Sequence, residues 1–457
     1  MKINPDIFRE YDIRGTVDTD LSTEFAKLLG RAYARLAIAE KCYRIGVGFD
    51  CRLTSEAYAH AFAEGLATEG LQALITGMGP TPQLYYSIHK YKLGGGVQIT
   101  GSHNPPDMNG FKLCLGTDTL TPQQIQELRI KMLELRDTSG STEIGEISSI
   151  DVRQEYIREI AVNCKPHMGS RKLKVVVDAG NGVGGLVGPQ VLRELGVDVI
   201  ELYCDPDGTF PNHHPDPTVL ENIRELQQRV ISEKADLGIG WDGDADRIGV
   251  VDEKGQVIFG DMLLLIYARD ILSREKNAII IGDVKCSALL FEDVEKRGGQ
   301  ALMWKTGHSL IKSKLKECNG AIGGEMSGHI AFKNRYYGFD DAIYSSSRLV
   351  EIVSQSEQPL SDYLKDLPQV VSTPEIRIDC PEDVKFLLAT KAQDAFPEYK
   401  VDTTDGVRIQ FESGWGLVRA SNTQPVLVMR FEADNQANLD KYRKLVTSRL
   451  EEIKGSL

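Results

Sequence analysis

Three stretches of the chain share one order of apolar and polar positions. Each begins with a short apolar run that reaches an acid at or near its end; these runs cover residues 44–50, 174–179 and 278–283. A stretch with helical spacing follows and closes on a glycine, at 55–70, 186–196 and 287–298. Because glycine adopts the left-handed conformation easily, it commonly follows the last turn of a helix. We therefore expect a strand and then a helix in each stretch.

The three stretches also continue in a common way. A second apolar run follows each predicted helix, at 72–76, 197–203 and 301–304. A third run leads into a polar, glycine-rich loop, at 95–102, 237–242 and 320–325. Such alternation is typical of a parallel or mixed sheet covered by helices. Strand–helix–strand units are common, but three of one layout favour duplication of a single α/β unit.

Composition indicates where these units end. Residues 138–149 are rich in Ser, Thr and Gly and are predicted to be a linker, and a helix over 151–163 opens the second unit. The second unit closes near 253–255 and the third near 367–368. We therefore expect four domains, at 1–148, 149–254, 255–368 and 369–457.

The last of these domains lacks the repeated pattern. Its pattern predicts three strands, at 375–379, 407–411 and 426–433. It also predicts two helices, at 384–396 and 437–455. The predicted fold class is α/β, with three homologous mixed-sheet α/β/α units followed by a C-terminal α+β domain.

Charge and cysteine content narrow the function. The 457 residues carry a net charge of −13, which disfavours binding to nucleic acid or to an anionic membrane. Eight cysteines without a Cys-x-x-Cys pair indicate reduced thiols rather than disulfides or a zinc site. The longest apolar stretch, 262–268, is too short to cross a bilayer, and the N-terminus has no apolar run. We expect a cytoplasmic protein without a nucleic-acid or membrane partner.

The first glycine-rich loop contains a candidate nucleophile. Ser102 follows Gly101 and precedes a proline pair, so we expect a hydroxyl displayed toward solvent. Such a hydroxyl suits a covalent nucleophile or phosphate carrier, and Lys112 supplies a cation ten residues later. From this loop alone an ordinary turn is equally favoured. A Ser-His-Asp triad is disfavoured, because the side chains of Ser102 and His103 would diverge on an extended chain.

The second loop is a candidate metal site. Asp242, Asp244 and Asp246 alternate along the chain, so their carboxylates project to one side and converge on a hard cation such as Mg²⁺ or Ca²⁺. An EF-hand begins in the same way, but Arg247 stands where its invariant glycine belongs, and the flanks are predicted to be strands. A solvated acidic turn is the remaining alternative.

Two further segments suit the recognition of a sugar and of a phosphate. Glu325, Ser327 and His329 lie among glycines, and one carboxylate accepts two sugar hydroxyls at once. Taken alone, His329 is more often a structural histidine. The fourth segment gathers many donors before a proline, at Arg419, Ser421, Asn422 and Thr423. That set suits a phosphate dianion, although alone it also fits a capping turn.

Together, in this order and spacing, the four segments resemble the α-D-phosphohexomutase superfamily, and most closely its bacterial phosphomannomutase/phosphoglucomutase branch. The opening Phe8-Arg-Glu-Tyr-Asp-Ile-Arg-Gly15 also resembles the N-terminal signature of that family. Any one loop is a moderately specific sign of this family, whereas the full set is very specific for it. The resemblance spans nearly the whole chain. The resemblance implies four domains around a central cleft, the first three sharing one mixed-sheet unit.

The resemblance also implies roles for individual residues. Ser102 would carry the transferable phosphate and would bind Mg²⁺ with the three aspartates. The transferring group would be stabilised by Lys112, Arg14 and Arg247, with His329 as a candidate acid or base. Glu325 and Ser327 would hold sugar hydroxyls. The other substrate contacts would come from Tyr11, Lys285, His308, Arg419, Ser421, Asn422 and Thr423.

The implied reaction is reversible phosphoryl transfer between the 1- and 6-positions of a mannose or glucose phosphate. It would pass through a phosphoserine and a hexose 1,6-bisphosphate, with glucose 1,6-bisphosphate as activator. The expected partner is a hexose phosphate, and the expected assembly is a monomer. The alternatives are a phosphoglucosamine mutase, which Met326 disfavours by the same resemblance, a metal-dependent sugar phosphatase, and a non-catalytic sugar-phosphate sensor.

Overall fold

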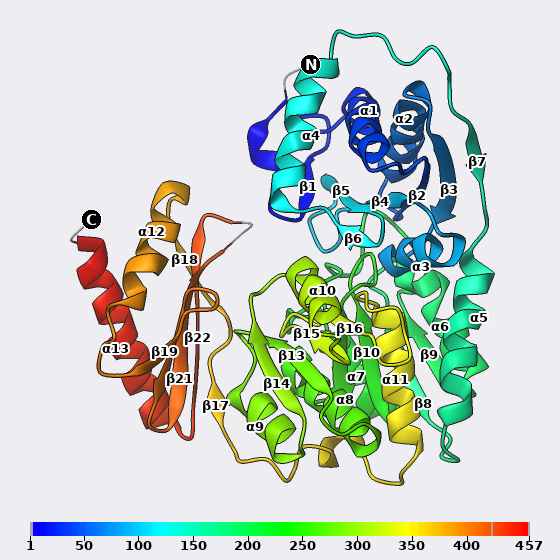
Figure 1. Cartoon of the computed structure of the whole chain (residues 1–457). Coiled ribbons are helices and arrows are strands. Elements are labelled where there is room, and N and C mark those ends of the chain that lie inside the picture. Colours follow the sequence, from blue (N-terminus) through cyan, green and yellow to red (C-terminus); the bar gives the residue numbers. More distant parts are fainter. Residues whose placement is uncertain (1–2, 422–423, 456–457) are drawn as a thin grey trace. The chain divides into compact units, whose positions relative to one another are not determined.

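The computed structural model describes residues 3–421 and 424–455 (Figure 1). The chain forms two compact units. The larger unit contains Met1–Leu263 and Ser327–Asp362, and the smaller unit contains Leu264–Met326 and Tyr363–Leu457. Within the described residues, no helix combines the length and the apolar character that a membrane span needs.

The first sheet of the larger unit is mixed, as predicted. Its order is β1-β5-β4-β2-β3-β7, with β6 beside β5. Strand β2 is parallel to β3 and β4, whereas β5 is antiparallel to β4 and β1. The strands are β1 (Asp12–Thr16), β2 (Arg44–Phe49), β3 (Gln72–Met78), β4 (Gly95–Ile99), β5 (Met108–Leu115), β6 (Asp118–Thr119) and β7 (Ile147–Ser149). The helices are η1 (Pro5–Ile7), α1 (Thr23–Ala39), α2 (Ser55–Thr68), α3 (Thr81–Tyr91) and α4 (Pro122–Leu135).

The second sheet of the larger unit has the order β12-β11-β10-β8-β9. Its strands are β8 (Lys174–Asp178), β9 (Asp198–Leu202), β10 (Leu237–Trp241), β11 (Ile248–Asp252) and β12 (Val257–Ile258). The helices of this part are α5 (Arg153–Cys164), η2 (Lys165–His167), η3 (Val183–Leu186), α6 (Gly188–Glu194) and α7 (Arg224–Glu233). The segment 327–362 adds β16 (Ile330–Phe332), α11 (Ala342–Ser354) and η4 (Leu360–Asp362), and α11 packs on α5 and α6.

The smaller unit contains strands of two sheets. In the first sheet, β13 (Ile279–Asp283) lies between β14 (Gln300–Trp304) and β15 (Ile322–Gly324) and is parallel to both. The helices beside it are α8 (Gly260–Arg274), α9 (Ala288–Lys296) and α10 (His308–Glu317). The antiparallel sheet has the order β17-β22-β21-β20-β19, with β18 beside β22. Its elements are β17 (Val371–Ser372), β18 (Ile376–Asp379), α12 (Glu382–Gln393), β19 (Lys400–Asp402), β20 (Val407–Phe411), β21 (Gly414–Ala420), β22 (Val426–Ala433) and α13 (Gln436–Gly455).

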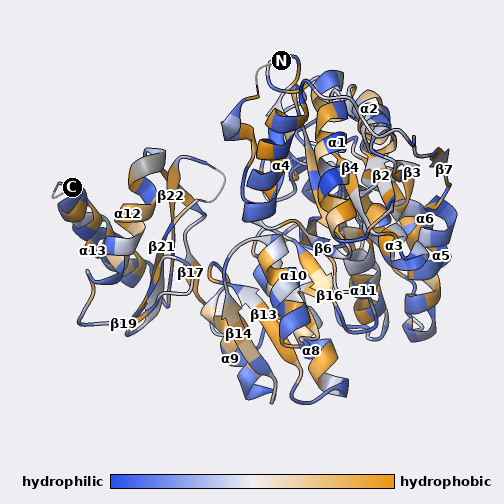
Figure 2. Cartoon of the chain, turned by 45° about the horizontal axis from the view of Figure 1, so that its top comes forward, coloured by the Kyte–Doolittle hydropathy of each residue, from blue (hydrophilic) through white to orange (hydrophobic). Residues whose placement is uncertain are grey.

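Glycine ends the first helix of each repeated stretch, which confirms the sequence prediction. Gly70, Gly196 and Gly298 have φ angles of 89°, 86° and 82°, in the left-handed region. The helices carry hydrophilic as well as hydrophobic residues (Figure 2), as expected of helices that cover a core on one face. The three glycine-rich loops follow β4, β10 and β15, whose residues are buried.

The sequence prediction missed several elements of the fold, among them strands in the predicted linker and in the C-terminal domain. The predicted linker 138–149 contains β7, which pairs in parallel with β3 at the edge of the first sheet. In the C-terminal domain, β17, β19 and β21 were not predicted, although the three predicted strands and both helices are present. Strand β21 has glycine at positions 414 and 416, which weakens the local β signal, and it forms because β20 and β22 flank it.

Candidate active site

Ser102 lies in the loop between β4 and β5, and its conformation is unusual for a residue with a side chain. Its φ angle is 49°, in the left-handed region, and its backbone N–H donates to Thr100 Oγ1 at 2.8 Å. The side-chain Oγ donates to Asp242 Oδ2 at 2.8 Å. The candidate nucleophile therefore faces the candidate metal loop directly.

Two details of this loop correct the sequence analysis. The expected display of Ser102 toward solvent is wrong, because the residue is 1% exposed while the two prolines are exposed. The side chains of Ser102 and His103 do not diverge either, since the chain is not extended at Ser102. Ser102 Oγ lies 3.1 Å from His103 Nδ1. Burial and nearby cations, Arg247 first among them, hold the pKa of His103 well below its usual value, which favours a neutral imidazole.

The three predicted metal ligands converge on the turn between β10 and β11. Asp242, Asp244 and Asp246 are fully buried, and one carboxylate oxygen from each lies within 4.8 Å of the others. Burial and the charges of the other two raise the pKa of Asp242 well above its usual value. The strands on both sides confirm that the turn is not an EF-hand loop, and its burial excludes a solvated acidic turn.

Two neighbours hold one oxygen of Asp244 and leave the other without a donor. Asp244 Oδ2 accepts from Thr81 Oγ1 at 2.5 Å and from Lys112 Nζ at 2.6 Å. Asp244 Oδ1 is buried and has no hydrogen-bond partner among the described residues. A buried carboxylate oxygen without a donor is costly, and a cation satisfies it. The set of carboxylate oxygens therefore fits a hard divalent cation such as Mg²⁺.

Lys112 supplies the cation that the sequence analysis expected beside the serine. From β5 its ammonium reaches Asp244 and also Asp246. Although burial acts in the opposite direction, these two carboxylates raise the pKa of Lys112 above its usual value. Lys112 is therefore charged at neutral pH and balances part of the acidic cluster. Gly243 allows the loop of aspartates to pack closely on the loop of Ser102, since a Cβ at position 243 would lie 2.4 Å from the backbone oxygen of Ser102.

Arg247, His329 and Ser327 join the same part of the larger unit. Arg247 and His329 form an isolated antiparallel bridge, and Arg247 Nε lies 3.3 Å from His329 Nε2. His329 Nε2 is 3.2 Å from Asp246 Oδ1, and His329 Nδ1 is 3.4 Å from Ser327 Oγ. Asp246, His329 and Asp340 form a second group whose ligand atoms lie close together. His329 is thus beside the acidic cluster rather than in a separate structural role.

The N-terminal signature reaches the serine loop through one arginine. Arg14 on β1 donates from Nη1 to Asn104 Oδ1 at 2.9 Å and lies 3.4 Å from the backbone oxygen of Gly101. Its Nε forms an ion pair with Asp12 Oδ2 at 2.6 Å. Tyr11, the other predicted residue of this segment, is buried directly before β1.

In the smaller unit, the predicted residues Lys285, His308 and Glu325 lie at the ends of its parallel strands. Glu325 Oε1 accepts from the backbone N–H of Gly307 at 2.7 Å, at the start of α10, and His308 is the first residue of that helix. Lys285 Nζ lies 3.2 Å from Glu375 Oε2. Burial opposes the shift, but nearby carboxylates, with Glu375 the strongest, raise the pKa of Lys285. Lys285 is therefore a charged, largely buried cation near the predicted sugar carboxylate.

The predicted phosphate-binding segment follows β21. Arg419 Nε donates to Asp405 Oδ2 at 2.9 Å, and the same oxygen accepts from the backbone N–H of Thr306 at 3.0 Å. Ser421 Oγ accepts from the backbone N–H of Gln424 at 3.2 Å. The two other predicted residues, Asn422 and Thr423, lie outside the described residues. Asp405 thus links Arg419 to the segment that ends at His308.

Sequence reasoning did not identify several residues of these networks. Thr81 is the first residue of α3, and the only local signal was its position between Pro80 and Pro82 at a helix start. His103 was dismissed because an extended chain was assumed. Asp405 lies in a turn without any motif, and its role depends on partners that are distant in the sequence.

The repeated α/β/α domains and the buried serine that faces three aspartates define the class of α-D-phosphohexomutases. Four models of phosphoglucomutase/phosphomannomutase domains match the chain in order: α/β/α domain I at residues 5–136, domain II at 154–255, domain III at 259–371 and the C-terminal domain at 375–448. The chain belongs to the phosphoglucomutase/phosphomannomutase family.

Named relatives agree with this assignment over at least 95% of their lengths. The chain is 45% identical over 455 residues to a phosphomannomutase/phosphoglucomutase of Pseudomonas aeruginosa, which covers 99% of this chain and 96% of the relative. It is 44% identical to a phosphoglucomutase of Neisseria meningitidis, with 95% of each chain covered. A crystal structure of a phosphoglucomutase/phosphomannomutase family protein from Burkholderia thailandensis has a TM-score of 0.92 at 39% identity, and covers 99% of this chain and 98% of the other.

Proposed function

We propose that this chain is a phosphohexomutase, which moves a phosphoryl group between the 1- and 6-positions of glucose or mannose phosphate. The observation that supports the proposal most is the contact of 2.8 Å between Ser102 Oγ and Asp242 Oδ2, inside an acidic cluster that Lys112 partly balances. A serine in that place can carry a phosphoryl group beside a divalent cation. The named relatives, which are phosphoglucomutases and phosphomannomutases, favour these sugars.

The proposed cycle uses Ser102 as donor and then as acceptor. The 6-hydroxyl of a hexose 1-phosphate attacks the phosphorus of phosphoserine 102, the bond from phosphorus to Oγ breaks, and the hydroxyl proton passes to a base. The resulting glucose or mannose 1,6-bisphosphate reorients end for end. Ser102 Oγ then attacks the phosphorus on O1, the bond from that phosphorus to O1 breaks, O1 takes the proton back from the base, and the hexose 6-phosphate is released. His329 and His103 are the nearby candidate bases, because both imidazoles lie beside the acidic cluster or Ser102.

Charge balance explains the proposed roles of the other residues near Ser102. Phosphoryl transfer depends on positioning and on neutralising the oxygens of the moving group. A Mg²⁺ ion held by Asp242, Asp244, Asp246 and the serine phosphate would supply that positive charge when bound. Lys112, Arg14 and Arg247 would contribute further positive charge from the protein itself.

We propose that the remaining predicted residues bind the sugar and its second phosphate. Glu325 would accept hydrogen bonds from sugar hydroxyls, Ser327 would exchange hydrogen bonds with them through its own hydroxyl, and Arg419 would hold the phosphate that does not react. The other proposed contacts come from Tyr11, Lys285, His308, Ser421, Asn422 and Thr423. We further propose a cytoplasmic monomer with domains at 1–148, 149–254, 255–368 and 369–457, activated by glucose 1,6-bisphosphate.

Phosphorus NMR tests the proposal directly. The protein is incubated with Mg²⁺, glucose 1-phosphate and a trace of glucose 1,6-bisphosphate, and the run is repeated with mannose 1-phosphate. Appearance of the 6-phosphate resonance establishes the mutase, and the ratio of the two rates gives its sugar preference. The Ser102→Ala variant should form no 6-phosphate. Release of inorganic phosphate would instead indicate a sugar phosphatase, and conversion of glucosamine 1-phosphate alone would indicate a phosphoglucosamine mutase.

A further inference from the structure

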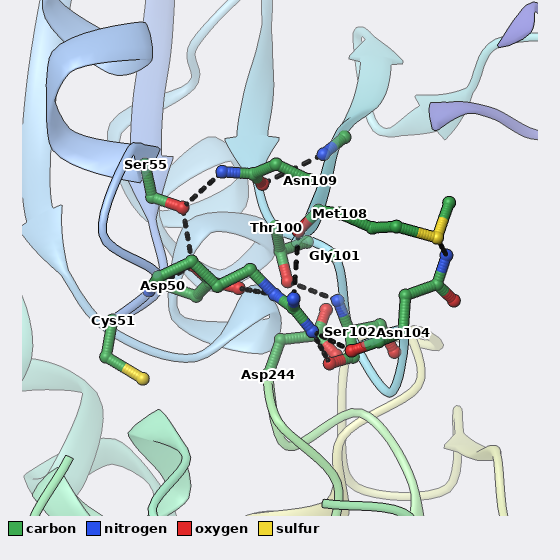
Figure 3. A network of polar contacts seen from close by, with 12 residues as sticks. Asp50, Cys51, Ser55, Thr100, Gly101, Ser102, Asn104, Met108, Asn109 and Asp244 are labelled. Carbon is green, nitrogen blue, oxygen red and sulfur yellow. Dashed lines mark hydrogen bonds and ion pairs between the residues drawn. The ribbon is translucent and has the colours of Figure 1, made fainter. Parts of the chain in front are cut away.

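A single buried guanidinium holds the loop that carries Ser102. Arg52 follows β2 and is 3% exposed. Its two terminal nitrogens donate to four backbone oxygens of the loop: Nη2 to Ser102 at 2.8 Å and Asn104 at 2.5 Å, and Nη1 to Pro105 at 2.6 Å and Met108 at 2.9 Å. Figure 3 shows the loop residues Ser102, Asn104 and Met108 together with Thr100 and Gly101. Four backbone oxygens between Ser102 and Met108 thus accept from one side chain.

Asp50 holds Arg52 in place. Its Nε lies 3.3 Å from Asp50 Oδ2, and its backbone N–H donates to Asp50 Oδ1 at 2.9 Å. Asp50 Oδ1 also accepts from Ser55 Oγ at 2.5 Å, and Ser55 Oγ accepts from the side-chain amide of Asn109. Figure 3 shows this chain of contacts from Asp50 through Ser55 to Asn109. The guanidinium therefore has an ion-pair partner at Nε and backbone acceptors at its two terminal nitrogens.

The backbone of Ser102 is held on both sides as a result. Its N–H donates to Thr100 Oγ1, and its carbonyl oxygen accepts from Arg52. A non-glycine residue in the left-handed region persists only where its surroundings determine its conformation. With both of its backbone polar groups held, Ser102 has little freedom to leave that conformation, and its side chain is directed at Asp242.

We propose that Arg52 is a positioning residue for phosphoryl transfer through Ser102. This inference rests on the proposed mutase function. Arg52 touches neither the side-chain oxygen of Ser102 nor the three aspartates through any described hydrogen bond or ion pair, and it acts by fixing the loop. A planar guanidinium offers five donors in a fixed fork, whereas a lysine ammonium offers three donors from one point. A lysine at position 52 keeps the charge but cannot satisfy four carbonyls in two directions.

The Arg52→Lys variant tests the proposal, and Arg31→Lys is a matched control. Arg31 lies in the same domain, is 8% exposed, pairs with Glu69 at 2.7 Å, and donates to the backbone oxygens of residues 135, 138 and 139 at 3.0–3.1 Å. Arg31 thus has the same kind of hydrogen-bond network as Arg52, but it holds a different loop and does not contact Ser102. Thermal midpoints are measured for both variants.

Activity is measured with glucose 1-phosphate, Mg²⁺ and glucose 1,6-bisphosphate. We expect kcat of Arg52→Lys to fall about 10²-fold, because a misplacement of reacting groups by about 1 Å has an effect of that size. We expect KM to change less than about threefold, because Arg52 acts on the serine loop. For Arg31→Lys we expect kcat within about twofold of the wild type. The phosphorylated Arg52→Lys enzyme should also lose more of its phosphate to water, relative to transfer to sugar. A purely structural role would lower the thermal midpoint without changing that ratio.

A second variant keeps the inference testable if Arg52→Lys does not fold. In Gly101→Ala the new Cβ would lie 2.5 Å from Arg52 Cζ, so the guanidinium is displaced while every charge stays. It should show the same loss of kcat. Equal kcat values for Arg52→Lys and Arg31→Lys, or a Gly101→Ala variant with wild-type kcat, would overturn the role of Arg52. Absence of any 6-phosphate with the wild-type protein would instead overturn the proposed function.

Discussion

Thr81 Oγ1 donates a hydrogen bond of 2.5 Å to Asp244 Oδ2, across 163 residues of sequence. The backbone N–H of Thr81 donates to the backbone oxygen of the same aspartate at 2.9 Å. Two donors from the start of α3 therefore fix Asp244 in one orientation. Because Oδ2 is occupied in this way, Oδ1 is the oxygen of Asp244 that is available to a cation.

The Thr81→Val variant should weaken metal binding. Valine has nearly the same shape as threonine but no hydroxyl, so Asp244 Oδ2 loses one donor and can rotate. Removing a hydrogen bond that orients a metal ligand typically lowers metal affinity or activity about 10- to 100-fold. We expect the Mg²⁺ concentration for half-maximal activity to rise by that factor. Thr81→Ser keeps the hydroxyl and should stay close to the wild type; an unchanged Mg²⁺ dependence in Thr81→Val would contradict the prediction.

The Lys112→Met variant should make the folded state depend on the cation. Without its ammonium, the buried carboxylates of Asp244 and Asp246 repel each other, and breaking a buried ion pair of this kind costs about 3–5 kcal/mol. We expect a lower thermal midpoint without metal and a larger increase on adding Mg²⁺ than the wild type shows. Phosphoryl transfer should also be lost.

A surface lysine gives the control for this prediction. Lys27 pairs with Glu64 at 3.0 Å, but both side chains are about half exposed. Exposed pairs contribute about 0–1 kcal/mol, so Lys27→Met should leave the thermal midpoint and its response to Mg²⁺ nearly unchanged. Equal midpoints for Lys112→Met and Lys27→Met without metal would show that Lys112 does not stabilise the acidic cluster.

The repeated acids show how far the sequence could predict the site. Their positions at the ends of β2, β8 and β13 followed from the apolar runs before them, because a buried strand has a recognisable composition. Their partners differ: Asp50 accepts from Ser55, Asp178 contacts His213 at 3.0 Å, and Asp283 accepts from Thr306 at 3.0 Å. No local pattern specifies such partners.

The same limit applies to the serine loop. Glycine, proline and the order of polar residues predicted a loop at Ser102, and a family resemblance supplied its role. The left-handed conformation of Ser102 was not predictable, because serine does not ordinarily require it. It depends on donors and acceptors from Arg52 and Thr100, and a sequence motif contains no information about such contacts when one partner lies 50 residues away.

The Asp405→Asn variant should weaken binding of the hexose phosphate more than it slows the reaction. Asp405 Oδ2 holds Arg419 Nε and the backbone N–H of Thr306 at once, so the neutral amide loses a charge-assisted contact. Losing such a contact typically corresponds to about a tenfold or larger change in affinity. We expect KM to rise about tenfold with kcat within about threefold. Asp402→Asn, on nearby β19, is the control and should match the wild type; a selective fall in kcat would contradict a role in phosphate binding.

The ion pair of Glu375 with Lys285 should make the smaller unit sensitive to acid. Burial alone would raise the pKa of Glu375, but Lys285 and then Arg377 lower it from 4.5 to about 2. Because the pKa is lower in the folded state, the stabilisation is complete above about pH 4.5 and is lost as pH falls toward 2. Its upper limit is about 3 kcal/mol. We expect the difference in thermal midpoint between the wild type and Glu375→Gln to be constant from pH 7 to 5 and to shrink steadily from pH 4.5 to 3. A difference that stays constant over the acidic range would show that Glu375 titrates alike in the folded and unfolded chain.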